Sequence, residues 1–295
     1  PAPMAVFVGF GIVAPEYGWN DYRGLDVRGK TVVMLVNDPG FYDPGLFRGK
    51  NMTYYGRWSY KFAEAGRQGA AAALLIHETE PASYGWNVVR NSWGRPIFRL
   101  DSGNGGKCGL EAWISLEAAQ RLCAAAGSDL DQLKKAALQK DFTPRRLPLR
   151  TSITFSNTVE KTVSRNVIAR VPGAEGADEC VIYTAHWDHF GKDEKISGDG
   201  IYNGALDNAS GTAALLELAA AFTRLGTPPR RSVLFLAVTG EEQGLLGSTY
   251  YVSHPVVPLD KTAAVINMDS LNIFGRMKDI QVVGYGLSEL DDVAR

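Results

Sequence analysis

Three short hydrophobic runs in the second half of the chain constrain its fold more than any other feature. They cover Cys180–Thr184, Ser232–Val238 and Ala263–Met268, and their β-branched and aromatic residues suit strands buried on both faces of a sheet. Between the first two runs, Ser210–Leu225 is rich in helix formers and stops before Gly226, which predicts a helix. A strand, a helix and another strand form a βαβ unit with parallel strands. We therefore expect an α/β domain here.

Metal-seeking side chains follow these runs. His186 follows the first, Glu241 and Glu242 follow the second, Asp269 follows the third, and Asp207 stands just before the predicted helix. Because the carboxyl ends of parallel strands meet at one edge of a sheet, we expect these side chains to lie close together. One imidazole nitrogen with several carboxylate oxygens suits zinc or a similar divalent ion. The sequence thus predicts a metal site whose ligands are His186, Asp207, Glu242 and Asp269.

The acidic residues of this predicted site need different roles. Asp207, on a loop between two strand ends, could bridge two ions about 3.5–4 Å apart, an arrangement used for hydrolysis. Consecutive residues at the end of a strand point in different directions, so Glu241 and Glu242 cannot both face the same group. We expect Glu242 to bind metal and Glu241 to face the substrate as the general base and then the general acid.

The histidine region suggests a further supporting residue. Asp188, two residues after His186, is placed to accept the second ring N–H of that histidine and so to fix its tautomer. Glu241 and Asp188 are thus the predicted catalytic residues. For His189 a structural role and a substrate-side role both stay open, whereas His254 reads as an ordinary loop residue.

Length and charge exclude several classes of protein. The chain has 295 residues, 45% of them hydrophobic, which is enough for two globular domains. Its formal net charge is −1, and the sequence shows no basic footprint for nucleic acid or for a membrane surface. Without a window of eighteen consecutive apolar residues, no membrane span is predicted. The three cysteines, Cys108, Cys123 and Cys180, are too few for a disulfide framework.

A change of composition near the middle of the chain predicts the domain boundary. Lys140–Arg150 is basic and contains proline, as inter-domain linkers do, and alternation typical of strands returns in Thr151–Pro172. Before this point Leu116–Gln139 carries helical periodicity. We place the boundary near Leu149, which gives a first domain with its linker at residues 1–149 and a second domain at residues 150–295.

Four motifs of the second domain carry a resemblance. They are H-W-D at His186–Asp188, G-A-L-D-N-A-S-G at Gly204–Gly211, T-G-E-E-Q-G-L-L-G-S at Thr239–Ser248 and N-M-D at Asn267–Asp269. In this order they resemble the co-catalytic dizinc aminopeptidase family, which includes secreted bacterial leucyl aminopeptidases and glutamate carboxypeptidase. The resemblance covers about residues 166 to 295. It implies a zinc-exopeptidase, phosphorylase/hydrolase-like mixed sheet with helices on both faces.

The same resemblance implies a function. It makes the whole protein a metallo-aminopeptidase, a hydrolase that removes N-terminal residues from peptides with metal-activated water, two zinc ions and Glu241 as the base. It also implies export to the periplasm or the medium.

The first domain resembles the protease-associated domain, a smaller β-rich α+β domain that shapes or covers the substrate entrance. Its matching segments are F-V-G-F-G-I-V-A-P, D-V-R-G-K-T-V-V-M-L-V and A-G-R-Q-G-A-A-A-A-L-L-I.

The chain departs from this family in one respect. The family closes its site with a further histidine downstream of the N-M-D motif, and the sequence reaches Arg295 without one. His254 precedes Asp269 and cannot take that place. We therefore expect a chain truncated at both ends, since it begins at Pro1 without a signal peptide, and a fragment that lacks the second metal and turnover.

Other functions remain open. A non-catalytic binding module could share the architecture, although the intact set His186, Asp207, Glu241, Glu242 and Asp269 argues against it. A glutaminyl-cyclase-like relative would bind a single zinc ion, and retention of His186 disfavours it. A carboxypeptidase differs from an aminopeptidase only in substrate. The sequence does not determine side-chain preference or oligomeric state.

Overall fold

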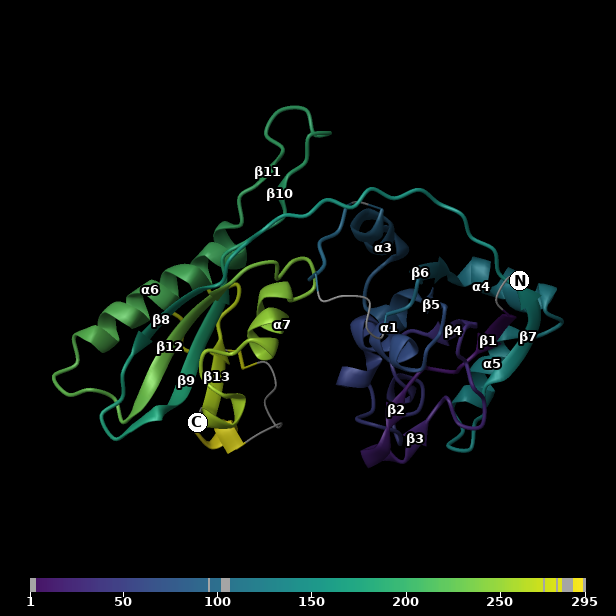
Figure 1. Cartoon of the computed structure of the whole chain (residues 1–295), viewed down its shortest axis with the longest axis horizontal. Helices are drawn as coiled ribbons and strands as arrows, with labels where there is room; N and C mark the ends of the chain where they lie inside the picture. Colours follow the sequence, from purple (N-terminus) through teal and green to yellow (C-terminus); the bar gives the residue numbers. More distant parts are fainter. Residues whose placement is uncertain are drawn as a thin grey trace. The chain divides into compact units, whose positions relative to one another are not determined.

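The computed structural model shows two compact units, each with its own mixed sheet and helices (Figure 1). The first unit comprises Pro1–Ile97 and Asp101–Glu160, and the second comprises Phe98–Leu100 and Lys161–Arg295. The residues described are 4–94, 96–101, 107–272, 274–279, 281–282 and 289–293. The expected mixed α/β class is confirmed. The assignment of the first unit to the protease-associated family stays a prediction.

The first unit is built on a five-stranded sheet in the order β6-β5-β4-β1-β7. Neighbouring strands pair in parallel except for β7, which runs antiparallel to β1. We expected a β-rich α+β domain, and this sheet has more parallel strand pairs than that class usually has. The strands are β1 (Met4–Phe7), β4 (Thr31–Leu35), β5 (Ala72–His77), β6 (Leu110–Ser115) and β7 (Arg145–Arg150), with a separate β2 (Val13–Ala14) and β3 (Trp19–Asn20) pair.

Helices cover both faces of this sheet. On one face Phe62 and Ala65 of α1 (Trp58–Arg67) pack on the strands, and on the other face α4 (Leu116–Ala125) and α5 (Leu130–Ala137) do so. The central strands β4 and β5 are buried at every position, as their uninterrupted hydrophobic runs predict. Two shorter helices, α2 (Thr79–Ala82) and α3 (Trp86–Trp93), follow β5.

For this unit the structure refines one sequence prediction and corrects another. The segment with helical periodicity forms two helices, α4 and α5, because Gly127 has a φ of +68° and Asp129 caps a new helix by accepting the N–H of Gln132. The second half of the predicted linker is a strand, since β7 pairs with β1 and buries Leu147. Residues 151–165 are coil, so the alternation there does not produce a strand.

The second unit is built on a four-stranded sheet in the order β13-β9-β12-β8. Strand β9 (Gly176–His186) pairs in parallel with both β12 (Arg231–Val238) and β13 (Thr262–Asn267), and β8 (Val167–Val171) runs antiparallel to β12. With α6 (Ser210–Thr223) between β9 and β12, the expected βαβ unit is confirmed. The carboxyl ends of β9, β12 and β13 therefore share one edge.

Helices cover both faces of this second sheet as well. Leu215 of α6 packs on one face with Ala185 and Phe235, whereas Tyr251 of α7 (Leu246–Ser253) packs on the opposite face with Ile182 and Leu234. Burying a side chain such as Leu234 stabilises the fold by roughly 1.5–3 kcal/mol. A short hairpin, β10 (Gly191–Lys192) and β11 (Ile201–Tyr202), follows β9. Within the described ranges the model contains no helix that is both long and apolar enough to traverse a membrane.

Candidate metal centre

His186 is the last residue of β9, and its side chain is only 2% exposed. Its Nδ1 lies 2.9 Å from the backbone carbonyl of Asp188, a distance at which an Nδ1–H donates to that oxygen. This hydrogen bond selects the tautomer whose Nε2 is free to bind a cation. That Nε2 lies 2.9 Å from Oδ1 of Asp207 and 3.6 Å from Oδ1 of Asp269.

The contact between Asp188 and His186 uses a different atom of Asp188 from the predicted one. The carboxylate Oδ1 stays 3.8 Å from Nδ1 of His186, and the backbone carbonyl accepts the ring N–H in its place. The carboxylate instead accepts the backbone N–H of Glu241 at 3.2 Å. Asp188 therefore connects the end of β9 to the loop that follows β12.

Asn208 holds two of the predicted ligands in place. Asp207 lies in an irregular turn, Ala205–Ala209, before α6, and the buried amide of Asn208 donates to the carbonyl of Met268 at 2.9 Å. Its Oδ1 accepts the N–H of Gly211 at 2.9 Å. This amide connects the Asp207 turn to the end of β13, next to Asp269. The sequence analysis gave Asn208 no role in the site, and the signal for one is an amide directly after a predicted ligand at a helix start.

Glycines shape the loop that carries the two glutamates. Gly240 has a φ of +64°, which favours glycine, and its carbonyl accepts the N–H of Leu246 at 2.9 Å. A Cβ at Gly247 would lie 2.4 Å from the carbonyl oxygen of Thr239, so the loop can close only with glycine there. The backbone conformation of this loop requires both glycines, which explains why Glu241 and Glu242 lie in a glycine-rich motif.

The two adjacent glutamates face different groups, as the argument from strand geometry predicts. Oε2 of Glu241 lies 4.0 Å from Nε2 of His186, whereas Oε1 of Glu242 lies 2.6 Å from Nδ1 of His189. One glutamate is therefore directed to each end of the cluster.

Burial and mutual repulsion shift the pKa values of these groups. Burial raises the pKa of Glu241, although the proximity of His186 opposes it and the carboxylates of Glu242 and Asp269 add to the rise. Burial and then the charge of Asp207 raise the pKa of Glu242. Burial alone would lower the pKa of His186, but its hydrogen bond and the surrounding carboxylates raise it overall. The cluster holds more negative charge than its own imidazoles balance, and a bound cation would compensate for it.

The ligand atoms form two groups with one residue in common. His186, Asp207 and Asp269 each place a ligand atom within 4.8 Å of the others, and so do His189, Asp207 and Glu242. Atoms bound tetrahedrally to one zinc ion at about 2.0–2.2 Å would be separated by about 3.3–3.6 Å. The separations of 2.9 Å and 3.6 Å around His186 fall close to this range.

Unpaired atoms show that these residues fit a metal. Four buried polar atoms in the cluster have no hydrogen-bond partner among the residues that the structure describes: Nε2 of His186, Nδ1 of His189, Oδ1 of Asp207 and Oε1 of Glu242. The same four atoms form two close contacts, of 2.9 Å between His186 and Asp207 and of 2.6 Å between His189 and Glu242. Buried polar atoms nearly always have hydrogen-bond partners, and cations held between these four would satisfy them together.

All the residues that the sequence assigned to the site lie in this cluster, and their individual roles stay predictions. His189, whose role the sequence left open, joins the cluster through Glu242. His254 lies outside it, exposed and stacked on Tyr250 with ring centroids 4.3 Å apart.

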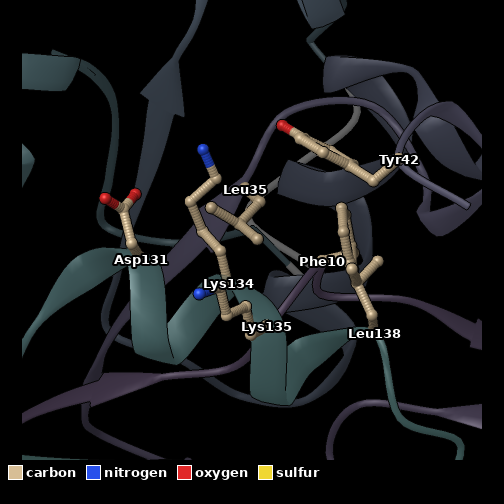
Figure 2. A pocket seen from close by; sticks show the side chains of 7 residues that line it. All are labelled: Phe10, Leu35, Tyr42, Asp131, Lys134, Lys135 and Leu138. Carbon is tan, nitrogen blue, oxygen red and sulfur yellow. The ribbon is translucent and has the colours of Figure 1, made fainter.

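The first unit has a cavity of a different kind, with a volume of about 260 Å³, beside α5 (Figure 2). Phe10, Leu35 and Leu138 supply its apolar lining. Lys134 pairs with Glu78 at 2.6 Å, and the hydroxyl of Tyr42 donates to the same carboxylate at 3.1 Å. The charge of Lys134 is thus paired, and no residue of the predicted site lines the cavity.

The second unit is therefore an α/β domain whose carboxyl sheet edge carries a cluster of imidazole and carboxylate groups that could hold a metal ion. Residues 166–295 match the family model described as Peptidase family M28.

Several known proteins are similar to part of the chain. Aminopeptidase NAALADL1 of Mus musculus is 36% identical over 122 residues, which are 40% of this chain and 15% of that protein. The probable glutamate carboxypeptidase AMP1 of Arabidopsis thaliana is 33% identical over 122 residues, 40% of this chain and 16% of that protein. A probable zinc metalloprotease of Pyrenophora tritici-repentis (strain Pt-1C-BFP) is 39% identical over 85 residues, 29% of this chain and 17% of that protein. The similarity thus spans less than a fifth of each of these relatives.

Proposed function

We propose that the protein to which this chain belongs is a zinc-dependent exopeptidase, and specifically an aminopeptidase. The observation that carries the proposal is the pair of ligand groups joined at Asp207, with Glu241 beside them. Relatives described as an aminopeptidase and as a zinc metalloprotease support it.

Zinc at this edge would polarise the scissile carbonyl and lower the pKa of water, towards roughly 7 in zinc sites of this kind. The residues of the chain supply the rest of the chemistry. Glu241, close to the ligand cluster but directed away from Glu242, takes the proton of the attacking water and returns it to the leaving amine. The raised pKa of Glu241 suits a group that must both accept and release a proton near neutral pH.

A carboxypeptidase is the second candidate, because one relative is described as a probable glutamate carboxypeptidase. The two activities require different chain ends to be free. Hydrolysis of an aminoacyl-anilide and of an N-terminally blocked peptide therefore separates them: an aminopeptidase cleaves only the first, and a carboxypeptidase only the second.

Replacement of Glu241 tests the proposed role in the whole protein. Glu241→Gln keeps the shape of the side chain but cannot accept the proton, so kcat for aminoacyl-anilide hydrolysis should fall by about 10²–10⁴-fold. Zinc content, measured by elemental analysis, should be unchanged.

Glu217→Gln, on the exposed side of α6, makes the same chemical change away from the cluster and should leave kcat unaltered. Full activity in Glu241→Gln would remove Glu241 from the mechanism. A wild-type protein that binds zinc and cleaves neither substrate would favour a binding module.

A further inference from the structure

A second cavity of the first unit, with a volume of about 480 Å³, lies at the carboxyl ends of β5 and β6. Its lining includes His77 and Ser115, the last residues of these two parallel strands, and residues that follow them in the chain. Ligands of α/β sheets bind outside the carboxyl ends of parallel strands, and small-molecule sites have volumes of about 300–1,000 Å³. The cavity therefore has the position and the size of a binding site.

His77 offers this cavity a free hydrogen-bond acceptor. Its imidazole is only 3% exposed and yet lines the cavity. Nε2 lies 2.9 Å from the backbone carbonyl of Tyr84, which can only accept, so Nε2 carries the proton and Nδ1 is the acceptor. No donor among the described residues bonds to Nδ1. Because Tyr84 does not line the cavity, Nδ1 is the polar atom that His77 can offer to a ligand there.

The charged groups that line the cavity are all acidic. Glu78 pairs with Lys134 at 2.6 Å, and Glu117 pairs with Arg121 at 3.2 Å in an exposed contact. The carboxylate of Glu80 has neither a salt bridge nor a hydrogen bond within the described part of the chain. The described lining contains neither lysine nor arginine, and Glu117 offsets the partial positive charge at the start of α4. The cavity is therefore complementary to a cation and not to an anion.

The spacing of these groups suits an organic cation better than a metal ion. Of the described acidic and imidazole groups that line this cavity, no three bring ligand atoms within 4.8 Å of one another. Trp86, the first residue of α3, adds an aromatic wall; it is 37% exposed, and its ring centroid lies 5.5 Å from that of His77. A guanidinium group stacks on an aromatic face and presents five N–H donors in a planar fork, whereas an ammonium is a compact point charge. Separated acceptors beside an aromatic ring thus favour a guanidinium.

We propose that this cavity binds the side chain of an arginine residue in a peptide. The guanidinium lies against the ring of Trp86 and donates to the carboxylate of Glu80 and to Nδ1 of His77, while the aliphatic stem contacts Pro81 and Leu116 of the lining. The site belongs to the first unit alone and does not depend on the chemistry proposed for the second unit.

Titration of the 295-residue chain with Nα-acetyl-arginine amide, followed by NMR of the indole N–H signals, tests the proposal. The signal of Trp86, assigned by its loss in Trp86→Leu, should move with a Kd on the order of 1 mM. The signal of Trp187, which is next to His186 in the second unit, should stay in place. Nα-acetyl-citrulline amide has nearly the same shape without the charge and should bind about tenfold more weakly.

Variants of the lining test the individual contacts. Glu80→Lys places an ammonium where the guanidinium is expected, so binding should be lost. Glu160→Lys makes the same change at an exposed position of the first unit outside the cavity and should leave Kd unchanged. Trp86→Leu keeps an apolar wall and should weaken binding, measured by calorimetry, by about 2–5-fold. Circular dichroism should be the same for all these proteins.

Three results would overturn the proposal: equal binding of the arginine and citrulline compounds, unchanged binding in Glu80→Lys, or no movement of the Trp86 signal below about 10 mM ligand. Movement of the Trp187 signal alone would place the arginine compound at the His186 cluster. That result would also overturn the proposal, but it would leave the proposed peptidase function intact.

Discussion

Each unit of this protein buries ionisable side chains, but the two units differ in the partners that these side chains have. In the first unit Lys61 is 0% exposed and donates to the carbonyl of Phe10 at 2.6 Å. Buried Asp21 accepts the N–H of Ile12 at 3.0 Å and the indole N–H of Trp19 at 2.9 Å. In the second unit the buried atoms around His186 face one another without such partners in the described residues.

This difference separates a structural charge from a binding site. Burial raises the pKa of Asp21 and lowers that of Lys61, but hydrogen bonds to the chain itself compensate each group. In the His186 cluster the imidazoles and carboxylates contact mainly one another, and a bound cation would compensate the carboxylates that the imidazoles do not balance. Four experiments test this contrast, from the largest expected effect to the smallest.

Asp21→Ala should cost the most stability. The substitution leaves the N–H groups of Ile12 and Trp19 unpaired and removes the carboxylate that most favours the charged form of Lys61. The free energy of unfolding should therefore fall by about 3–5 kcal/mol. Urea denaturation measures the change. Asp26→Ala, which breaks only an exposed pair with Arg28, should have little effect, and an equally small loss for Asp21→Ala would refute the structural role.

Zinc should stabilise the second unit alone. A ligand at a hundred times its Kd adds about 2.7 kcal/mol to the free energy of unfolding of the unit that binds it. Thermal denaturation of the metal-free chain, with and without zinc, should show one transition shifting upwards while the transition of the first unit stays in place. His186→Ala should abolish the shift. Equal shifts of both transitions would contradict the assignment of the ligand groups to one unit.

Glu242→Gln should make the metal-free protein slightly more stable while weakening zinc binding. The pKa of Glu242 is raised in the folded state by burial and by Asp207, so ionisation of this carboxyl favours unfolding. The advantage of the variant should therefore be absent well below pH 4.5 and should grow as the pH rises through the raised pKa. Thermal melts across this range measure it. A metal-free variant less stable than the wild type at neutral pH would show that Glu242 is structural.

Asp188→Asn should have the smallest effect. Loss of an outer partner of a metal ligand typically lowers metal affinity by about 10–100-fold. Because the backbone carbonyl of Asp188 is the acceptor for His186, the substitution should stay at or below about tenfold. Calorimetric titration with zinc gives the affinity. A hundredfold loss would show that the carboxylate at 3.8 Å from the imidazole matters more than the backbone contact.

The sequence predicted those parts of the fold that are determined by residues close together in the chain. The parallel strands around β9 and the ligands at their carboxyl ends follow from hydrophobic runs and from the direction of a βαβ unit. Strand β7 could not be predicted in this way. Its sequence is basic and contains proline, and it forms a strand by pairing with β1, which is far away in the sequence.

The contacts of His189 and Asn208 could not be predicted from the sequence for a related reason. Each depends on how a loop lies in space: His189 on the gap at Gly204, and Asn208 on the position of Met268. Spacing along the chain carries no information about such contacts. The ligands at strand ends were accessible because a sheet fixes where its strands end.

Because Asp207 belongs to both ligand groups, two ions bound there would not bind independently. The first ion bound would order the Asp207 carboxylate, so the second ion would bind without that loss of conformational entropy. The effect is reciprocal, because each ion changes the affinity for the other by the same factor. Loading should therefore be cooperative, and a chelator that extracts one ion should loosen its neighbour.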